Sequence, residues 1–235
     1  MAKKSVTSKP ELFTKKTFVF LRELEKNNTR EWFAENKTRY EAEVLFPAIA
    51  FVSQMQSGIA KLSSYLLAEP KRMGGSIMRI YRDTRFSKDK SPYKTNVGIH
   101  FRHSMGGDVH APAYYVHIEP SECFVAAGMW MPPAEPLAAI RHAIMEEPSV
   151  WRKCKKNSRF AKRFILDGES LKTAPRGIAT DHPEIVDLRR KSYAAVAKID
   201  DAVVTSESFV EVVLTAFSDA KPFMKYLCDA IGQPF

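Results

Sequence analysis

The sequence is poor in cysteine and has no long apolar run. Its three cysteines stand far apart in 235 residues and form no Cys-x-x-Cys pair: Cys123, Cys154 and Cys228. This usage excludes a disulfide framework and is typical of reduced thiols in the core of a cytoplasmic protein. No apolar run approaches the roughly 20 residues of a membrane-spanning helix, and the N-terminus lacks the apolar segment of a signal peptide. We therefore expect a cytoplasmic protein with no membrane partner.

The sequence also lacks the short motifs of common catalytic, cofactor and metal sites. It contains no P-loop, no Gly-x-Gly-x-x-Gly, no Gly-x-Ser-x-Gly and no His-Glu-x-x-His. Two histidines with one carboxylate would suffice to ligate a metal, and the candidates are His100 and His117 with Asp83 or Glu119. Their spacing matches no established metal pattern, so we predict neither a metal nor a cofactor.

Charge is plentiful, and cations exceed carboxylates. The chain is 45% hydrophobic and 27% charged, as folded globular proteins are, and its net charge is +9. A chain of this length is able to form one large core without disulfides. We expect a single α+β domain over residues 11–235, preceded by a disordered basic arm over residues 1–10. The positive charge favours anionic partners, although a merely basic protein would have the same composition.

Hydrophobic periodicity predicts helices first, then strands, then helices again. Helical spacing occurs over residues 13–26, 47–62, 133–147, 150–160 and 207–231, with Asn28 as the N-cap of one further helix and Pro148 as the end of another. Alternation predicts strands at residues 76–83, 95–103, 114–119, 123–131 and 193–199. Short connections favour antiparallel pairing. The expected fold class is α+β, with an antiparallel sheet of about four or more strands packed on one face by helices from the N- and C-terminal parts.

Alternation also divides the predicted strands into two faces. One face is apolar and must lie under the helices. The other face carries Asn96, His100, Tyr115, His117, Glu119 and Trp130. A solvated outer face is one interpretation, because antiparallel sheets commonly have one. A ligand-binding floor is the other, because aromatic and small residues are unusual on a plain solvent face.

The most informative segment is residues 79–96, RIYRDTRFSKDKSPYKTN, which packs six cations and two aspartates around three aromatic residues. Arginine forks and lysine ammonium groups suit phosphate and carboxylate. We predict an anion-binding site formed by Arg79, Arg82, Arg85, Lys88, Lys94, Asn96, His100, Tyr115 and Trp130. Asp83 and His117 are the candidate acid–base groups of that site.

The alternative for the same segment is an internal ion-pair network. Asp83 would pair with Arg79 or Arg85, and Asp89 would pair with Lys88 or Lys90. In either case we expect three aromatic residues to anchor the segment in the core: Tyr81, Phe86 and Tyr93.

Residues 76–96, SIMRIYRDTRFSKDKSPYKTN, closely resemble the signature of DUF2461, a widespread bacterial family of unknown function. Further stretches match it: NNTREWFAENKTRYE (27–41), YYVHIEP (114–120), GMWMP (128–132) and SYAAVAKIDDAVV (192–204). The resemblance covers roughly residues 11–230. It implies a bacterial, single-domain α+β protein, and it implies no particular reaction, cofactor or partner.

A second basic stretch, residues 151–163, holds seven cations with Trp151 and Phe160 between them. Together with residues 79–96 it supports the hypothesis of a nucleic-acid-associated protein, because such stretches suit phosphate tracking. Bases would then stack on Trp130 or Tyr115. A solvated basic helix is the other interpretation of this stretch.

Three functions therefore stay open. The first is a cationic pocket for a small phosphate- or carboxylate-bearing ligand, with or without a reaction. The second is nucleic-acid binding by both basic stretches. The third is a structural or protein-interaction module.

Overall fold

The computed structural model describes residues 12–106 and 110–235, and the basic arm expected at residues 1–10 lies outside them. Before the sheet come α1 (Lys15–Lys26), α2 (Arg30–Glu35), α3 (Lys37–Tyr40), the π-helical turn η1 (Glu41–Leu45) and α4 (Phe46–Leu62). The strands are β1 (Val97–Arg102), β2 (Ala113–Ile118), β3 (Phe124–Met129), β4 (Ile165–Asp167) and β5 (Tyr193–Lys198). The later helices are α5 (Ala134–Glu146), α6 (Pro148–Lys155), α7 (Ser158–Arg163), α8 (Ile185–Leu188), α9 (Asp201–Val204) and α10 (Phe209–Ala230). This order confirms the α+β class.

The five described strands form one antiparallel sheet in the order β1-β2-β3-β5-β4. One row of paired residues crosses the whole sheet: His100, Tyr115, Ala126, Val196 and Ile165. Side chains of directly paired residues lie on the same face, so this row defines what we call the open face of the sheet. The residues next to them along each strand point to the opposite face.

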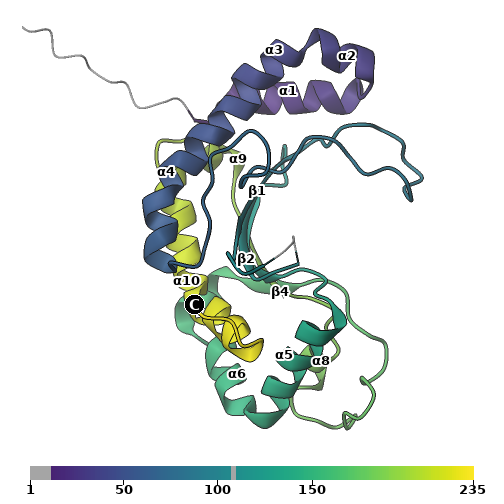
Figure 1. The fold of residues 1–235 in the computed structure, drawn as a ribbon, viewed down its shortest axis with the longest axis vertical. Coiled ribbons are helices and arrows are strands. Elements are labelled where there is room, and N and C mark those ends of the chain that lie inside the picture. The colour runs from purple at the N-terminus through teal and green to yellow at the C-terminus, as the bar shows by residue number, and fades with distance from the viewer. Residues whose placement is uncertain (1–11, 107–109) are drawn as a thin grey trace, which may run out of the picture.

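Helices α4 and α10 cover that opposite face, as Figure 1 shows. Its side chains are fully buried, among them Ile99, Phe101, Tyr114, Val116 and Val125. The Tyr114 ring stacks on Phe217 of α10 with ring centroids 4.4 Å apart. Burial of this much apolar surface fixes which residues of each strand face the helices. The alternation predicted for β1, β2 and β3 is thus confirmed.

Figure 1 shows the open face on the side away from α4 and α10, between the loop before β1 and the chain that connects β4 to β5. No helix in the described ranges is long and apolar enough to cross a membrane.

The strand predicted at residues 76–83 is wrong. Its first part lies along β1, where Met78 N donates to Gly98 O at 2.9 Å and Ile77 forms an isolated bridge with Ile99. The chain then leaves β1, and Ile80 O accepts from Lys94 N at 2.7 Å. Because the backbone changes its partner after Met78, no regular strand forms.

The predicted N-cap at Asn28 is also wrong. Thr29 is the N-cap of α2, because its hydroxyl accepts from Trp32 N at 3.2 Å. The predicted end of α5 before Pro148 is confirmed, and Pro148 itself begins α6, since proline is tolerated where helical N–H groups have no partner. The basic helix predicted over residues 150–160 is broken at Asn157, which caps α7.

Gly128 joins β3 closely to β5. Its φ is +125°, and a Cβ there would come 2.1 Å from the carbonyl oxygen of Tyr193. We expect Gly128→Ala to lower the free energy of unfolding by roughly 2–4 kcal/mol, because backbone strain and overlap both oppose it. Urea denaturation followed by circular dichroism measures the change.

Gly177→Ala is the matched control, because Gly177 has φ +82° with nothing within 4 Å of an added Cβ. Strain alone should cost roughly 1–2 kcal/mol there. Equal losses in the two variants would contradict a steric role for Gly128.

Candidate functional site

The charged segment, residues 79–96, is a long loop folded on itself before β1, and we call it the charged loop. Its two limbs are joined by hydrogen bonds from Arg82 N to Pro92 O at 2.9 Å and from Lys94 N to Ile80 O at 2.7 Å. In Figure 1 it is the blue-teal loop that extends from the sheet at the upper right. The loop therefore has an end at the sheet and a far end away from it.

Tyr93 anchors the end of the charged loop nearest the sheet. Its ring stacks on Phe33 of α2 with centroids 4.1 Å apart. Asn28 binds the backbone of Tyr93 twice, because its Nδ2 donates to Tyr93 O and its Oδ1 accepts from Tyr93 N, each at 3.0 Å. The Asn28 amide thus binds both backbone polar groups of one residue, as a residue of a neighbouring antiparallel strand would.

The prediction that Tyr81 and Phe86 are core anchors is wrong. Tyr81 is 57% exposed and Phe86 is 95% exposed, whereas Tyr93 is buried. Only the end of the loop held by Asn28 reaches the apolar core. The Phe86 ring instead lies 5.8 Å from the guanidinium carbon of Arg85.

The far end of the charged loop is partly neutralised by its own two carboxylates. Arg85 Nη2 lies 2.7 Å from Asp83 Oδ2, and this pairing lowers the pKa of Asp83 to about 2. Arg82 pairs with Asp89, and the pKa of Asp89 is lowered first by hydrogen bonds from Ser91 and then by Arg82. The ion-pair alternative therefore describes this end of the loop, although the partner of Asp89 is Arg82 and not a lysine.

The end nearest the sheet borders a cavity of about 650 Å³ that contains cations and no carboxylate among the described residues that line it. We call it the cationic cavity. Its polar walls come from three parts of the chain: Arg72 and Ser76 before the charged loop, Arg79 and Lys94 from its two limbs, and His100 and Arg102 from β1. Met78 and Gly74-Gly75 complete it.

Neither Arg79 nor Lys94 forms a side-chain hydrogen bond or a close ion pair within residues 12–106 and 110–235, although the charge of Arg79 also contributes to the lowered pKa of Asp83. Lys94 is half-buried, and burial together with the charge of Arg79 lowers the pKa of its ammonium group. Arg72 is paired with Glu41, and Arg102 lies 3.8 Å from Glu69. The unpaired positive charge of the cavity is therefore concentrated at Arg79 and Lys94.

A smaller cavity of about 390 Å³ shares Lys94 with the cationic cavity. Two further predicted residues line it, Arg82 and Asn96. It is also lined by Glu25 and Asp89, so its charge is mixed. Of the remaining predicted cations, Arg85 and Lys88 are exposed on the charged loop and line neither cavity.

Of the residues predicted on the sheet, His100 lines the cationic cavity, whereas Tyr115, His117 and Trp130 do not. Tyr115 pairs with His100 across β1 and β2, and its hydroxyl hydrogen-bonds to His117. Trp130 follows β3, is 52% exposed and does not line the cationic cavity. Asp83 and His117, the two acid–base candidates, also lie outside its lining: Asp83 is on the exposed loop and His117 is on β2.

Two cations of the cavity were missed by the sequence prediction, Arg72 and Arg102. Arg102 lies two residues after His100 on β1, so strand alternation alone would have placed it on the open face. Arg72 carries no such signal, because it lies in an irregular segment before Gly74.

The second basic stretch is partly neutralised. Lys155 pairs with Glu184 and Asp187, Arg152 pairs with Glu184, and Arg163 pairs with Asp219. Trp151 and Phe160 are buried, and Trp151 Nε1 donates to Asp187 at 2.8 Å. These two aromatic rings are therefore inaccessible to nucleic-acid bases, contrary to the pattern that suggested the interface.

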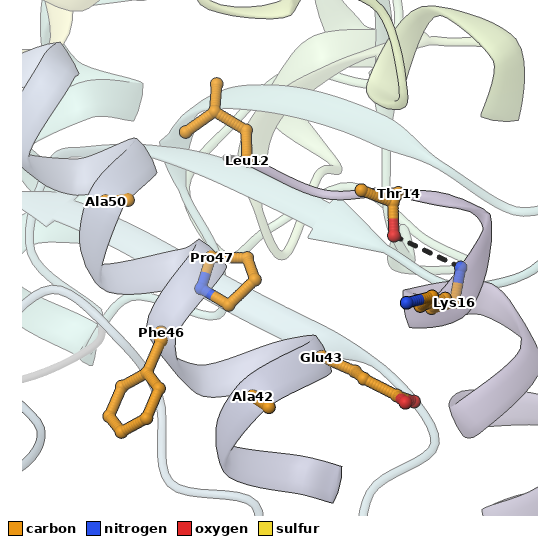
Figure 2. A pocket seen from close by; sticks show the side chains of 8 residues that line it. All are labelled: Leu12, Thr14, Lys16, Ala42, Glu43, Phe46, Pro47 and Ala50. Atoms are coloured by element: carbon orange, nitrogen blue, oxygen red, sulfur yellow. Dashed lines mark hydrogen bonds between the residues drawn. The ribbon is translucent and has the colours of Figure 1, made fainter. Parts of the chain in front are cut away.

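An apolar groove and the three cysteines are weaker candidates for a functional site. Figure 2 shows a groove of about 380 Å³ between the segment before α1 and the start of α4, lined mainly by apolar side chains such as Leu12, Phe46 and Pro47. Burial raises the pKa of each of the three cysteine thiols to about 12, so none is an activated thiolate. Among the residues that the structure describes, no three His, Cys, Asp or Glu side chains gather to hold a metal ion.

Fold and site together define an α+β protein with a cationic cavity beside the edge strand β1. The chain matches DUF2461, described as a conserved hypothetical protein, over residues 16–226. It therefore belongs to this family, as its sequence predicted. No curated protein and no solved structure matches the chain.

Asn28 positions the charged loop, so we expect Asn28→Ala to lower the free energy of unfolding by roughly 1–3 kcal/mol, because both polar groups of the Tyr93 peptide lose their partner. Trypsin should also cleave faster within residues 79–96. Chemical denaturation and timed proteolysis measure the two effects. Asn27→Ala is the control, since the Asn27 amide makes one exposed hydrogen bond, to Glu23 O. A comparable effect of both variants would contradict the anchoring role.

Proposed function

We propose that the protein binds a small phosphate- or carboxylate-bearing anion in the cationic cavity. The observation that carries this proposal is that Arg79 and the half-buried Lys94 line one cavity, and neither forms a close ion pair with a carboxylate in the described part of the chain. The exposed Arg79 and the half-buried Lys94 repel each other, and an anion that joins them relieves this repulsion. A volume of about 650 Å³ suits a small molecule.

The shape of the charge distribution favours this function over nucleic-acid binding. Figure 1 places the charged loop at the upper end of the molecule and α6 at the lower end. A continuous basic stripe between residues 79–96 and 151–163 would have to cross that distance. In addition, three cations of the second stretch are already paired with carboxylates. As part of the same proposal, residues 11–235 form one domain of a cytoplasmic bacterial protein.

Calorimetric titration with inorganic phosphate and with succinate tests the proposal. We expect Arg79→Gln and Lys94→Met each to weaken binding at least about tenfold, because each removes one charge-assisted contact. Arg85→Gln is the control and should change affinity less than about twofold, because Arg85 pairs with Asp83 outside the cavity.

Absence of binding for both anions in the unmodified protein would overturn the proposal. Affinity for a single-stranded oligonucleotide that resists Arg79→Gln would favour the nucleic-acid alternative instead.

The lowered pKa of Lys94 gives a second test. Its usual value is 10.5, and burial and Arg79 both favour the neutral amine. Lys94 therefore loses its charge at lower pH than an exposed lysine, and we expect sulfate affinity to fall as the pH rises toward about 10. Lys94→Arg keeps its charge over this range, so its sulfate affinity should fall less. Parallel pH profiles for the two proteins would exclude Lys94 as an anion contact.

A further inference from the structure

Four polar side chains form a hydrogen-bonded chain on the open face, beside the cationic cavity. The Tyr115 hydroxyl lies 3.0 Å from His117 Nδ1, and His117 Nε2 lies 2.9 Å from Glu119 Oε2. The Thr95 hydroxyl donates to Glu119 Oε1 at 2.8 Å. Strand alternation brings the first three together, and Thr95 joins them from the end of the charged loop.

The partners fix the direction of each proton in this chain. The Glu119 carboxylate is an acceptor only, so Thr95 and His117 Nε2 donate to it. Because Nε2 carries the imidazole proton, Nδ1 has a free lone pair and accepts the phenolic proton of Tyr115. Every proton of the chain is thus directed toward Glu119, and the Tyr115 oxygen keeps a lone pair for a further group.

The surroundings hold this arrangement in one geometry. The His117 ring stacks on Phe124 with centroids 4.5 Å apart and planes inclined by 9°, and its side chain is only 12% exposed. Lys198 of β5 follows Phe124 in the same cross-strand row. Packing of this kind fixes the orientation of a base without a further ligand.

Gly98 places the Tyr115 hydroxyl next to the cavity. A Cβ at Gly98 would lie 2.8 Å from that hydroxyl and 2.9 Å from the Met78 sulfur. The hydroxyl and Met78 are therefore neighbours, and Met78 lines the cationic cavity. His100, the cross-strand partner of Tyr115, lines it too. A side chain at position 98 would occupy the space between them.

We propose that Tyr115 is a base-activated hydroxyl that accepts an acyl group, with His117 as the acceptor of its proton and Glu119 and Thr95 as positioning residues. The Tyr115 oxygen forms a bond to the acyl carbon, and its proton moves to His117 Nδ1. The leaving group departs with the electron pair of its bond to carbon and takes up the proton from His117. The imidazolium that forms meanwhile is stabilised by Glu119.

We call the hydrogen-bonded chain from Tyr115 through His117 to Glu119 the relay. This inference rests on the proposed function only for where the anionic part of an acyl donor would bind, because the relay itself needs no anion. Burial raises the pKa of Tyr115 to about 12, so the phenol is neutral near pH 7. Without the relay, Tyr115 should react more slowly than an exposed tyrosine. With it, Tyr115 should react faster.

Acetylation by N-acetylimidazole, a small neutral acyl donor, distinguishes these cases. Peptide mass spectrometry follows Tyr115 and, as internal control, Tyr81, which is 57% exposed. We expect Tyr115 to be acetylated at least tenfold faster than Tyr81. His117→Gln should slow Tyr115 at least tenfold and leave Tyr81 unchanged, because glutamine offers the same hydrogen-bonding groups but takes up no proton.

The pH dependence separates proton acceptance from mere positioning. In the unmodified protein, the Tyr115 rate should rise with pH and level off once the imidazole is neutral. In His117→Gln it should keep rising with pH, since only phenolate then reacts. Arg85→Gln, remote from the chain, should match the unmodified protein in both respects.

Slower acetylation of Tyr115 than of Tyr81, or equal Tyr115 rates with and without His117, would overturn the relay. An unchanged thermal midpoint and Tyr81 rate show that His117→Gln is folded. Because the reagent is neutral, failure of the relay leaves phosphate binding intact, and failure of phosphate binding leaves acetylation intact. The two proposals are therefore refuted by different results.

Discussion

Burial of one face of the sheet against α4 and α10 determines where the candidate side chains on the strands lie. Phe217 of α10 stacks on Tyr114, and Ile99 and Phe101 are fully excluded from water. Because strand side chains alternate, the burial of Tyr114 and Val116 forces Tyr115 and His117 to the opposite face. A shift of β2 by one residue would bury the imidazole of His117 and expose Val116. The free energy of apolar burial thus also orients the polar groups.

The clamp between Asn28 and Tyr93 divides the charged loop into two electrostatic environments. Beyond it, Asp83 and Asp89 are exposed and find arginines within the loop. Exposed pairs of this kind contribute little to stability and leave little net field. Near the clamp, Lys94 is held half-buried beside Arg79, and the carboxylates of the loop are occupied elsewhere. One sequence segment therefore contains both a part in which two arginines are paired with aspartates and a part whose two cations have no close carboxylate.

The polar chain from Tyr115 to Thr95 depends on both constraints. β2 supplies Tyr115 and His117 at a spacing of two residues, and the return limb of the charged loop supplies Thr95. Gly98 leaves the space in which the phenol lies. The charged loop supplies Lys94 to the cationic cavity and Thr95 to the polar chain. The two sites are neighbours for this reason.

Local patterns predicted much of this. The alternation of β1, β2 and β3 was read correctly because it needs only a period of two, and the helices with strong apolar spacing were found for the same reason. Three predictions were wrong, because in each case a contact with residues distant in the sequence, or the lack of one, determines the structure. Residues 76–83 alternate like a strand, but their backbone changes partner; Asn28 is a good helix cap, but it binds Tyr93; and Phe86 is aromatic, but no core lies within its reach.

The sequence by itself determined the family, the α+β class and the two-faced character of the strands, because signatures and periodicity are properties of neighbours along the chain. It also indicated that residues 79–96 concentrate charge. Only the tertiary structure decided which of those charges are paired, since an ion pair depends on a distance in space of a few ångströms. It joined Arg72 and Arg102 to Arg79 and Lys94, and it separated Trp130 and Asp83 from them. Linear spacing carries no information about such contacts between segments that meet only in the folded chain.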